Sequence, residues 1–403
     1  MENTKTVTTG YRWVVLSAFM FLTIMTQVLW ITFAPITSVA AEFYNTSDLM
    51  IGLLSMSFMI IYVVVVIPSA WVIDTLGFRK AVSIGAVISA VFALLRGIFA
   101  SNFGLMLACQ LGIAVGQPLV LGAITKLAAS WFLPDERATA SGLGTLSIYI
   151  GILIAMVATP LLTINLKMKG MLLFYGILSV VSAVVFLFVV KKPPEELKGD
   201  ADKERALMFV GLKSMLKQRD FIILLVIFFI GLGLFNGVST WVEQIVRPRG
   251  FSPSQAGILG GLMLIGGIIG AAVIPIVSDK IKKRKPFIII ALAGMLPGLL
   301  GITFATNYPV LLVSGFLFGL FLLSSGPIGF QYGAEITFPA PEGTSNSLLI
   351  VMGQISGIIF IYAMDAFKSG SGSMTVSLLI LMGLTIIGLL LSLFLKESPI
   401  SES

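Results

Sequence analysis

Long runs without a charged residue alternate with short charged segments along the whole chain. The runs cover residues 13–41, 49–73, 81–95, 97–125, 138–166, 170–190, 221–242, 250–278, 286–334, 343–364 and 369–395. A helix needs about 20 apolar residues to cross the hydrocarbon layer, so each run predicts a crossing. The run 286–334 is too long for one, and ATNYPV at 305–310 predicts a turn that splits it. The pattern therefore predicts an all-α membrane protein with twelve transmembrane helices.

Two features of these runs affect where the spans begin and end. The run before Arg96 is short and LRGIFA continues it, so we expect that span to reach Phe99 with Arg96 at the membrane interface. The first run is about twice as long as a signal-peptide core and lacks a clear small-residue cleavage site. It is therefore expected to be the first span.

Composition supports a membrane protein and narrows its chemistry. Hydrophobic residues make up 57% of the 403 residues and charged residues only 11%, which is far from the range of water-soluble domains. The single cysteine, Cys109, excludes an internal disulfide, and the chain has no histidine. We expect no cofactor and no metal. Without a histidine-based triad or a paired acidic motif, we also expect no enzyme activity.

The distribution of lysine and arginine predicts the orientation of the chain. If the amino terminus faces the cytoplasm, most of the 26 basic residues fall on cytoplasmic segments, as the positive-inside rule requires. We therefore expect a multi-pass protein of the plasma membrane with both termini in the cytoplasm. The net charge of +7 reflects this asymmetry, which predicts contact with anionic lipid at the cytoplasmic face and no nucleic-acid partner.

The longest polar segment, residues 191–220, separates two sets of six predicted spans. Its Pro-Pro start is typical of a linker, and ALMFVGLKSML within it is compatible with an amphipathic helix on the membrane surface. We predict an N-terminal six-helix bundle at 1–190, a cytoplasmic linker at 191–219 and a C-terminal six-helix bundle at 220–403. We expect a monomer.

Two pairs of segments match between the halves at nearly one offset. IPSAWVIDTLGFRKA at 67–81 matches IPIVSDKIKKRKP at 274–286, and ERATASGLGTLSIYIG at 136–151 matches EGTSNSLLIVMGQISG at 342–357. This agreement predicts a duplicated unit, a common plan of secondary transporters that alternate access around a central site.

The first pair carries a charged cluster with a predicted gating role. An aspartate near the inner end of a helix accepts hydrogen bonds from a neighbouring helix amino terminus or pairs with the nearby arginine, which would bias one conformation by roughly 1–2 kcal/mol. The predicted gating residues are Asp74, Gly77, Arg79, Lys80, Asp279 and Arg284. The alternative is that the cluster only anchors the topology.

The D-x-x-G-x-R-K arrangement at 74–80 resembles the loop signature of the major facilitator superfamily, which implies a 6+6 pseudo-symmetric fold. Further stretches resemble the feline leukaemia virus subgroup C receptor-related subfamily, whose members are linked to choline and haem transport. They are LWITFAPI around Trp30, residues 54–79, Gln117, LAASWF at 127–132, and residues 329–360.

A substrate site is expected near the membrane midplane, between the two halves. The polar or amphipathic residues closest to the midpoints of the first, fourth, seventh and eleventh spans are Gln27, Trp30, Gln117, Asn236 and Gln354. All are uncharged. Buried amides suggest a water-filled cavity or, alternatively, hydrogen bonds between helices. The alternative for Trp30 is packing in the core.

The resemblance implies a cation cage at these positions. Trp30, Gln117 and Gln354 match the aromatic and glutamine positions that hold choline and ethanolamine in the subfamily, and an indole face suits a quaternary ammonium. Asn236 stands where the family has a tyrosine, so one wall of the cage differs. Choline is one expectation, and another polar amine or a zwitterion is a second.

Four charged residues lie towards the ends of predicted spans and could form a vestibule or couple transport to an ion. Lys126 and Glu335 lie near cytoplasmic ends, and Glu243 and Asp365 near outer ends. Snorkelling or ion pairing explains such positions simply. The alternatives are an extracellular funnel at Glu243 and Asp365, and a site for an anionic substrate group at Lys126.

These observations predict a transporter that moves a small amine or organic cation by facilitated uniport, because no titratable residue lies at the midplane. Two alternatives stay open. One is a proton-coupled symporter or an exporter of an anionic or zwitterionic metabolite. The other is a receptor or sensor on the same fold that transports nothing.

Overall fold

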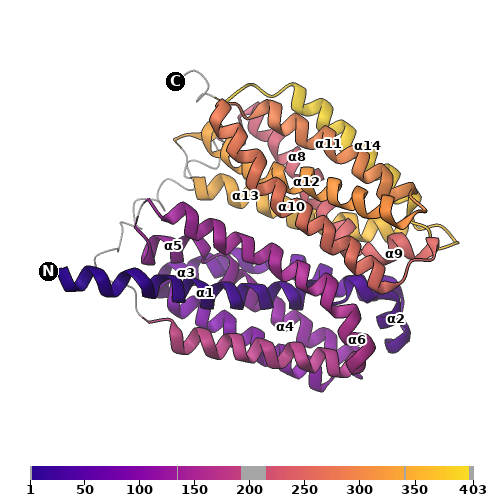
Figure 1. Ribbon diagram of the computed structural model, residues 1–403, viewed down its shortest axis with the longest axis horizontal. Coiled ribbons are helices and arrows are strands. Elements are labelled where there is room, and N and C mark those ends of the chain that lie inside the picture. Colours follow the sequence, from indigo (N-terminus) through magenta and orange to yellow (C-terminus); the bar gives the residue numbers. More distant parts are fainter. Residues whose placement is uncertain (1, 134, 192–214, 340–341, 399–403) are drawn as a thin grey trace. The chain divides into compact units, whose positions relative to one another are not determined.

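The computed structural model describes residues 2–133, 135–191, 215–339 and 342–398. Every regular element in these ranges is helical, which confirms the predicted all-α class (Figure 1). The chain divides into two compact units: Met1–Phe33 with Val39–Asp200, and Ala34–Ser38 with Ala201–Ser403. The short segment Ala34–Ser38 thus groups with the second unit. The predicted division at a single linker, 191–219, places this segment in the N-terminal bundle. Most of the predicted linker, including its amphipathic segment, lies outside the described residues.

The first unit is built from four long helices and two short ones. They are α1 (Glu2–Ile31), α2 (Thr37–Tyr44), α3 (Asp48–Ile98), α4 (Phe103–Leu121), α5 (Ile124–Trp131) and α6 (Arg137–Val189). The 51 residues of α3 and the 53 residues of α6 each exceed twice the length of one crossing. Both are interrupted, α3 at Gly77 (φ 79°) and α6 at Lys167 (φ 61°). Each interruption lies in a charged segment between two of the predicted spans.

Polar side chains close the starts of two helices in this unit. The Ser47 hydroxyl accepts a hydrogen bond from the backbone N–H of Met50, and the Asn102 side chain accepts one from Leu105. Both residues follow the usual N-cap pattern, in which a side-chain oxygen satisfies an amide that has no partner in the first turn. The caps explain why α3 begins at Asp48 and α4 at Phe103.

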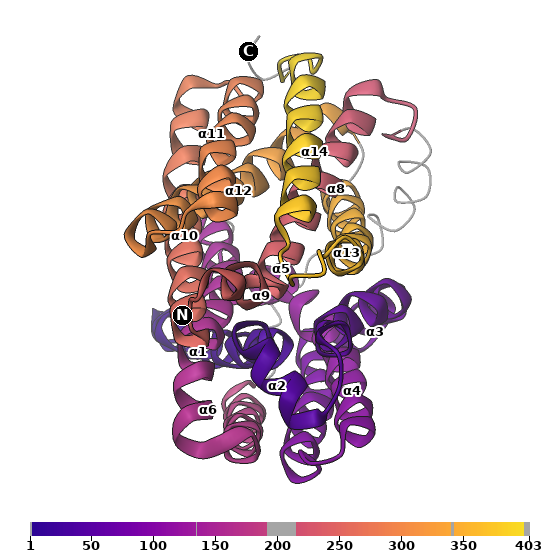
Figure 2. The same cartoon turned by 90° about the vertical axis from the view of Figure 1, so that its right-hand side faces the viewer.

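Among its described residues, the second unit contains six long helices and a short connection. They are α8 (Arg219–Thr240), α9 (Val242–Val246), the 3-10 turn η3 (Arg247–Arg249), α10 (Pro253–Ile281), α11 (Lys285–Phe304), α12 (Tyr308–Thr337), α13 (Glu342–Ala366) and α14 (Thr375–Leu393). The predicted turn at 305–310 is confirmed, because α11 ends at Phe304 and α12 begins at Tyr308. Within this unit α10 packs on α12, α12 on α11, and α8 on α13 (Figure 2).

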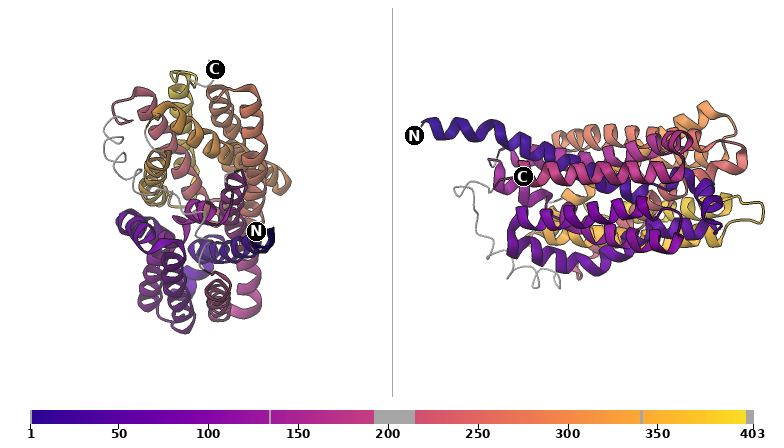
Figure 3. Two further views of the ribbon diagram at one scale, coloured as in Figure 1. Left: turned by 90° about the vertical axis from the view of Figure 1, so that its left-hand side faces the viewer. Right: turned by 90° about the horizontal axis from the view of Figure 1, so that it is seen from below.

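Ten helical segments of the described residues are long and apolar enough to cross a membrane. In each unit the long helices run roughly alongside one another (Figure 3). Many large apolar side chains lie on their outer faces, including Ile67, Trp71 and Phe188. Such exposure fits lipid as the surrounding solvent, because a bilayer removes the cost that water would impose on it.

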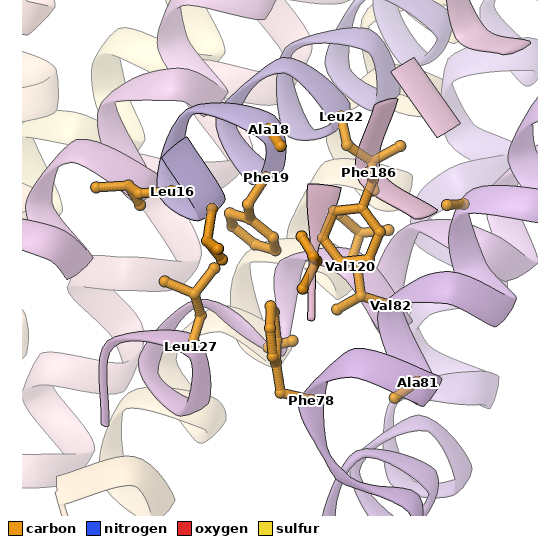
Figure 4. Packing of buried hydrophobic residues seen from close by; sticks show 14 of the residues in the cluster. Leu16, Ala18, Phe19, Leu22, Phe78, Ala81, Val82, Val120, Leu127 and Phe186 are labelled. Carbon is orange, nitrogen blue, oxygen red and sulfur yellow. The ribbon is translucent and has the colours of Figure 1, made fainter. Parts of the chain in front are cut away.

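The core of the first unit is apolar and joins helices far apart in the sequence. Phe19 of α1, Phe78 of α3, Val120 of α4 and Phe186 of α6 point toward one another (Figure 4). The Phe78 ring packs on the Phe19 ring at 6.2 Å and on the Phe186 ring at 6.0 Å between centroids. Phe78 directly follows the interruption at Gly77, so this cluster holds the second half of α3 in place.

In the second unit, α10 and α12 approach each other through glycines. A Cβ atom on Gly319 would lie 1.8 Å from the carbonyl oxygen of Met263, and one on Gly270 would lie 1.9 Å from that of Leu320. Small residues at a helix crossing let the backbones come close enough for van der Waals contact to hold them together in lipid. The charge-free run of α10 is therefore also a packing surface.

This close approach predicts opposite effects for two glycine-to-alanine substitutions. Gly319→Ala should lower the free energy of unfolding by about 1–3 kcal/mol, because the helices must separate to admit the methyl group. Gly383→Ala in α14 meets no atom within 4 Å, so it should raise stability by up to about 1 kcal/mol through helix propensity. Thermal unfolding of the purified variants in one detergent checks this, and equal melting temperatures would contradict it.

Candidate functional site

Three of the predicted substrate residues belong to the first unit. Trp30 lies near the carboxyl end of α1 with 8% of its surface exposed, and its indole Nε1 donates to the carbonyl oxygen of Ser55 on α3 at 3.2 Å. Gln27 is also buried, three residues earlier, and its Cβ packs where a side chain on Gly151 of α6 would otherwise lie. The bond to Ser55 fixes one edge of the indole.

The amide of Gln27 is incompletely satisfied. Its Nε2 has no hydrogen-bond partner among the described residues. Gln117, on α4, is also buried. Because a buried amide donor without a partner costs free energy, the helices around Gln27 leave one of its polar atoms unsatisfied.

The other two predicted substrate residues belong to the second unit. Asn236 of α8 is buried, and its Nδ2 donates to the carbonyl oxygen of Gly353 on α13 at 3.2 Å. Gln354 is the next residue on α13 and is partly exposed. The structure therefore brings Asn236 and the α13 segment around Gln354 together. The Nδ2 group of Asn236 therefore makes a hydrogen bond between helices α8 and α13.

The expected interface position of Arg96 is wrong. Its side chain is fully buried in the first unit, near the end of α3. The guanidinium donates to the carbonyl oxygen of Leu29 at 3.0 Å and to Gln110 Oε1 at 2.7 Å, with Thr32 Oγ1 at 3.5 Å. It also lies over the Phe33 ring, 5.8 Å from the centroid. These partners are neutral, and they hold the charge inside the protein instead of at the headgroups.

Gln110 completes this arrangement, which we call the Arg96 network. Its Nε2 lies 3.4 Å from the carbonyl oxygen of Leu29 and 3.3 Å from that of Leu54, so it links α1 with α3. Leu29 stands in the last turn of α1, where carbonyl groups have no partner within the helix. Arg96 and Gln110 therefore cap the end of α1 directly beside Trp30. Both hydrogen bonds donated by the Gln110 amide are thus made to backbone carbonyl groups of the first unit.

The first copy of the charged cluster forms a different ion pair from the one expected. Lys126 Nζ lies 2.8 Å from Asp74 Oδ1 and donates to the carbonyl oxygen of Ile73 at 3.0 Å. The expected pairing of Asp74 with Arg79 is wrong, since the Arg79 side chain makes no hydrogen bond or ion pair within the part of the chain that the structure describes. The non-helical backbone at Gly77 lies between the two residues, so they do not face each other across a regular helical turn.

In the second copy the expected pair does form, and it extends further. Arg284 contacts Asp279, and its Nη2 lies 2.9 Å from Glu335 Oε1 on α12. Burial alone would lower the pKa of Arg284, but the hydrogen bonds and charges of Glu335 and Asp279 raise it above its usual value. Glu397, after α14, accepts bonds from the backbone N–H groups of Arg284 and Lys285. Its carboxylate thus caps the start of α11.

Glu243 lies in a buried polar group of the second unit. It accepts hydrogen bonds from the backbone N–H of Ser38 at 3.1 Å and from the Ser38 hydroxyl at 2.6 Å. Gln244 Nε2 also donates to it at 3.0 Å, and Lys368 Nζ donates to Gln244 Oε1 at 3.1 Å. A funnel needs exposed acids, so full burial of Glu243 removes it from that role. Asp365 is partly exposed.

No group of three or more potential metal-ligating side chains occurs among the described residues. The predicted substrate residues bring together amides and the indole of Trp30, and the ion pairs lie near helix breaks and helix ends. This arrangement suits reversible binding of a small solute and offers no nucleophile with an adjacent base.

The family model of the Major Facilitator Superfamily matches residues 16–361 and 244–403 of the chain. The chain belongs to the Major Facilitator Superfamily. Its sequence is 31% identical over 369 residues to solute carrier family 49 member A3 of Xenopus tropicalis, covering 87% of this chain and 76% of the relative. It is 28% identical over 384 residues to the choline/ethanolamine transporter FLVCR1 of Felis catus, covering 89% of this chain and 68% of the relative.

Solved structures show the same fold. A bacterial homologue of the human lysosomal transporter Spinster, in an inward-facing and unoccupied conformation, matches with a TM-score of 0.75 at 16% identity, covering 96% of this chain and 98% of that one. A mutant of the nucleoside transporter NupG matches with a TM-score of 0.74 at 13% identity, covering 94% and 99%. The relatives and the fold are those of transporters, so the chain is a membrane transporter related to the FLVCR subfamily and not an enzyme.

The Arg96 network predicts a large cost for removing its charge. Arg96→Leu leaves Gln110 Oε1 without its donor and the Leu29 carbonyl with only the long bond from Gln110 Nε2, so we expect the free energy of unfolding to fall by about 2–3 kcal/mol. Arg96→Lys should restore part of this loss, because an ammonium replaces only some of the fork-shaped donors. Denaturant unfolding in detergent measures the change.

Arg247→Gln is the matched control, because Arg247 is exposed and lies in η3. A surface substitution of this kind should change stability by less than about 0.5 kcal/mol. If Arg96→Leu were no less stable than Arg247→Gln, the capping of α1 by Arg96 would be refuted.

Proposed function

We propose that this transporter moves a small amine or organic cation of the choline or ethanolamine type by facilitated uniport. The observation that carries the proposal is the buried set of Trp30, Gln27 and Gln117, in which an indole and two uncharged amides lie within one unit. Relatives at 26–28% identity named choline/ethanolamine transporters support the same class of cargo. Gln354 and Asn236 would contribute from the second unit.

Cation–π attraction gives the proposal its physical basis. A quaternary ammonium over an indole face gains about 0.5–2 kcal/mol, and more of it when water is excluded. The bond from Trp30 Nε1 to Ser55 fixes the ring before the cargo arrives, which reduces the ordering cost of binding. The Nε2 of Gln27, which is buried without a partner among the described residues, would donate to the hydroxyl oxygen of such an alcohol amine once a rearrangement of the helices exposes it.

We propose twelve crossings arranged as two sets of six. In the first unit, α1, the two halves of α3, α4 with α5, and the two halves of α6 would supply six crossings. In the second unit, α8 and α10 to α14 would supply the other six. With the positive-inside distribution, both termini would lie in the cytoplasm of a cell whose plasma membrane holds the protein as a monomer.

The charged clusters are proposed to bias the transport cycle. Asp74 with Lys126, and Arg284 with Asp279 and Glu335, are ion pairs at helix ends that a rearrangement of helices would break or form. Gly77 supplies the backbone conformation that places Arg79 and Lys80 after the break. Such contacts change the balance of states and do not select the cargo.

A second candidate is proton-coupled transport of a zwitterionic or anionic metabolite. It is favoured by the buried charges of Arg96 and Glu243, since a positive field near α1 suits a carboxylate and a buried acid can carry a proton. Arg96, however, has no exposed surface and donates to groups of the protein. In this second candidate, Arg96 would act on a cargo only through its electrostatic field and not by direct contact.

A ligand screen on the purified protein tests the cargo class. Choline or ethanolamine should raise the melting temperature more than betaine, amino acids or organic anions do. Trp30→Ala should weaken binding of the stabilising amine roughly 3- to 30-fold through loss of cation–π attraction, and Trp30→Phe should weaken it less. The control is Trp71→Phe, which alters an exposed tryptophan of α3.

Stabilisation by anions alone, with the same response in Trp30→Ala, would exclude the cation cage. Uptake into proteoliposomes then separates a transporter from a receptor. Binding without flux of any candidate would favour the sensor on the same fold.

A further inference from the structure

A pocket of about 340 Å³ lies on the outer side of the first unit, where the second half of α3 begins. Its lining combines two basic residues and a hydroxyl with three aliphatic residues. They are Arg79, Lys80 and Ser83, with Leu76, Ile84 and Leu187. No residue of the proposed substrate site takes part, so the pocket is a separate feature of the molecule.

The positive charges of this pocket have no protein counter-charge among the described residues. Asp74, the nearest acid along the chain, pairs with Lys126. Neither the Arg79 nor the Lys80 side chain makes a hydrogen bond or ion pair in the part of the chain that the structure describes. Ser83 donates to the carbonyl oxygen of Arg79 at 2.7 Å, so its own oxygen still has the capacity to accept.

The second unit shows that this situation is specific to the first copy of the duplicated segment. There Arg284 is nine-tenths buried and contacts both Asp279 and Glu335. Both matched segments carry an arginine, but Arg79 is partly exposed beside the exposed Lys80, whereas Arg284 is buried. An anion from outside the protein would therefore balance charge in the first copy, where the described part of the protein supplies no acid to Arg79 or Lys80, and has no such role in the second.

The apolar part of the pocket indicates where that anion comes from. Leu76, Ile84 and Leu187 are each about two-fifths exposed, and Phe188 beside them is 80% exposed on the lipid-facing surface of α6. Basic side chains next to lipid-facing aliphatic residues at a helix end lie at the level of the phospholipid headgroups. A soluble anion would leave these aliphatic residues uncovered.

We propose that Arg79, Lys80 and Ser83 bind the phosphate of an anionic phospholipid whose acyl chains cover Leu76, Ile84 and Leu187. The guanidinium presents two parallel N–H groups to the phosphate oxygens, and the ammonium of Lys80 adds a point charge. The lipid would neutralise the two positive charges that follow Gly77 and would pack against the start of the second half of α3 and the end of α6.

Native mass spectrometry of the detergent-purified full chain tests this site by counting bound phosphatidylglycerol and phosphatidylcholine. The wild type should retain phosphatidylglycerol in preference to phosphatidylcholine. The double variant Arg79→Gln with Lys80→Gln should weaken phosphatidylglycerol binding about fivefold for each cation removed. If that variant does not fold, Lys80→Gln alone, which changes an exposed side chain, should show the single fivefold loss.

The matched control is Lys282→Gln with Lys283→Gln, which removes the same charge from exposed positions after α10. It should bind phosphatidylglycerol as the wild type does. Glycerol phosphate should not displace the lipid, because it has no acyl chains. Equal binding by the two double variants, equal retention of both lipids, or displacement by glycerol phosphate would each overturn the proposal.

Discussion

A helix that ends inside a membrane protein leaves its last carbonyl groups without partners, and hydrocarbon offers none. Much of this structure depends on how those carbonyls are satisfied. Arg96 donates to Leu29 at the end of α1, and four further basic side chains serve other ends in the same way. They are Lys126 at Ile73, Arg137 at Phe132, Arg249 at Ala305 and Lys285 at Leu393. Cations suit these positions because the helix dipole is negative there.

The basic residues that enter the helical bundles are engaged with helix-end carbonyls, with an amide or with acids. In the first unit Trp30, Gln27 and Gln117 form a buried set of uncharged side chains, and the fully buried Arg96 lies beside it at the end of α1. The end of α1 is fixed by Arg96 and Gln110, and Trp30 stands within that same turn. Stability of the helix end and geometry of the proposed site thus depend on one network.

The sequence predicts the elements well and the partners of its charges poorly. The charge-free runs and the turn at 305–310 follow from local composition, and the helices of the structure occupy these runs and end at this turn. Arg96 was placed at the interface because the run before it is short, whereas its burial depends on a carbonyl 67 residues away and on Gln110 of the next helix. Likewise Asp74 pairs with a lysine 52 residues away and not with its neighbour Arg79.

Such pairings are set by the packing of distant helices, which no short stretch encodes. The segment after α14 shows the same limit. Glu397 caps α11 by accepting a bond from Arg284, which is 113 residues away in the sequence, and the residues next to Glu397 in the sequence do not indicate that role. The uncharged set around Trp30 was identifiable because depth along a span can be counted. How its amides share their hydrogen bonds, such as that of Asn236 with Gly353, required the three-dimensional structure.

The central claim, uniport of a cation through a neutral site, is tested most directly by uptake of labelled choline into proteoliposomes under a potassium diffusion potential. With 100 mV, inside negative, and equal pH on both sides, choline should accumulate about 50-fold, since the potential contributes about 2.3 kcal/mol per charge. At zero potential it should only equilibrate. Accumulation at zero potential that requires a pH gradient, with no response to voltage, would contradict the account.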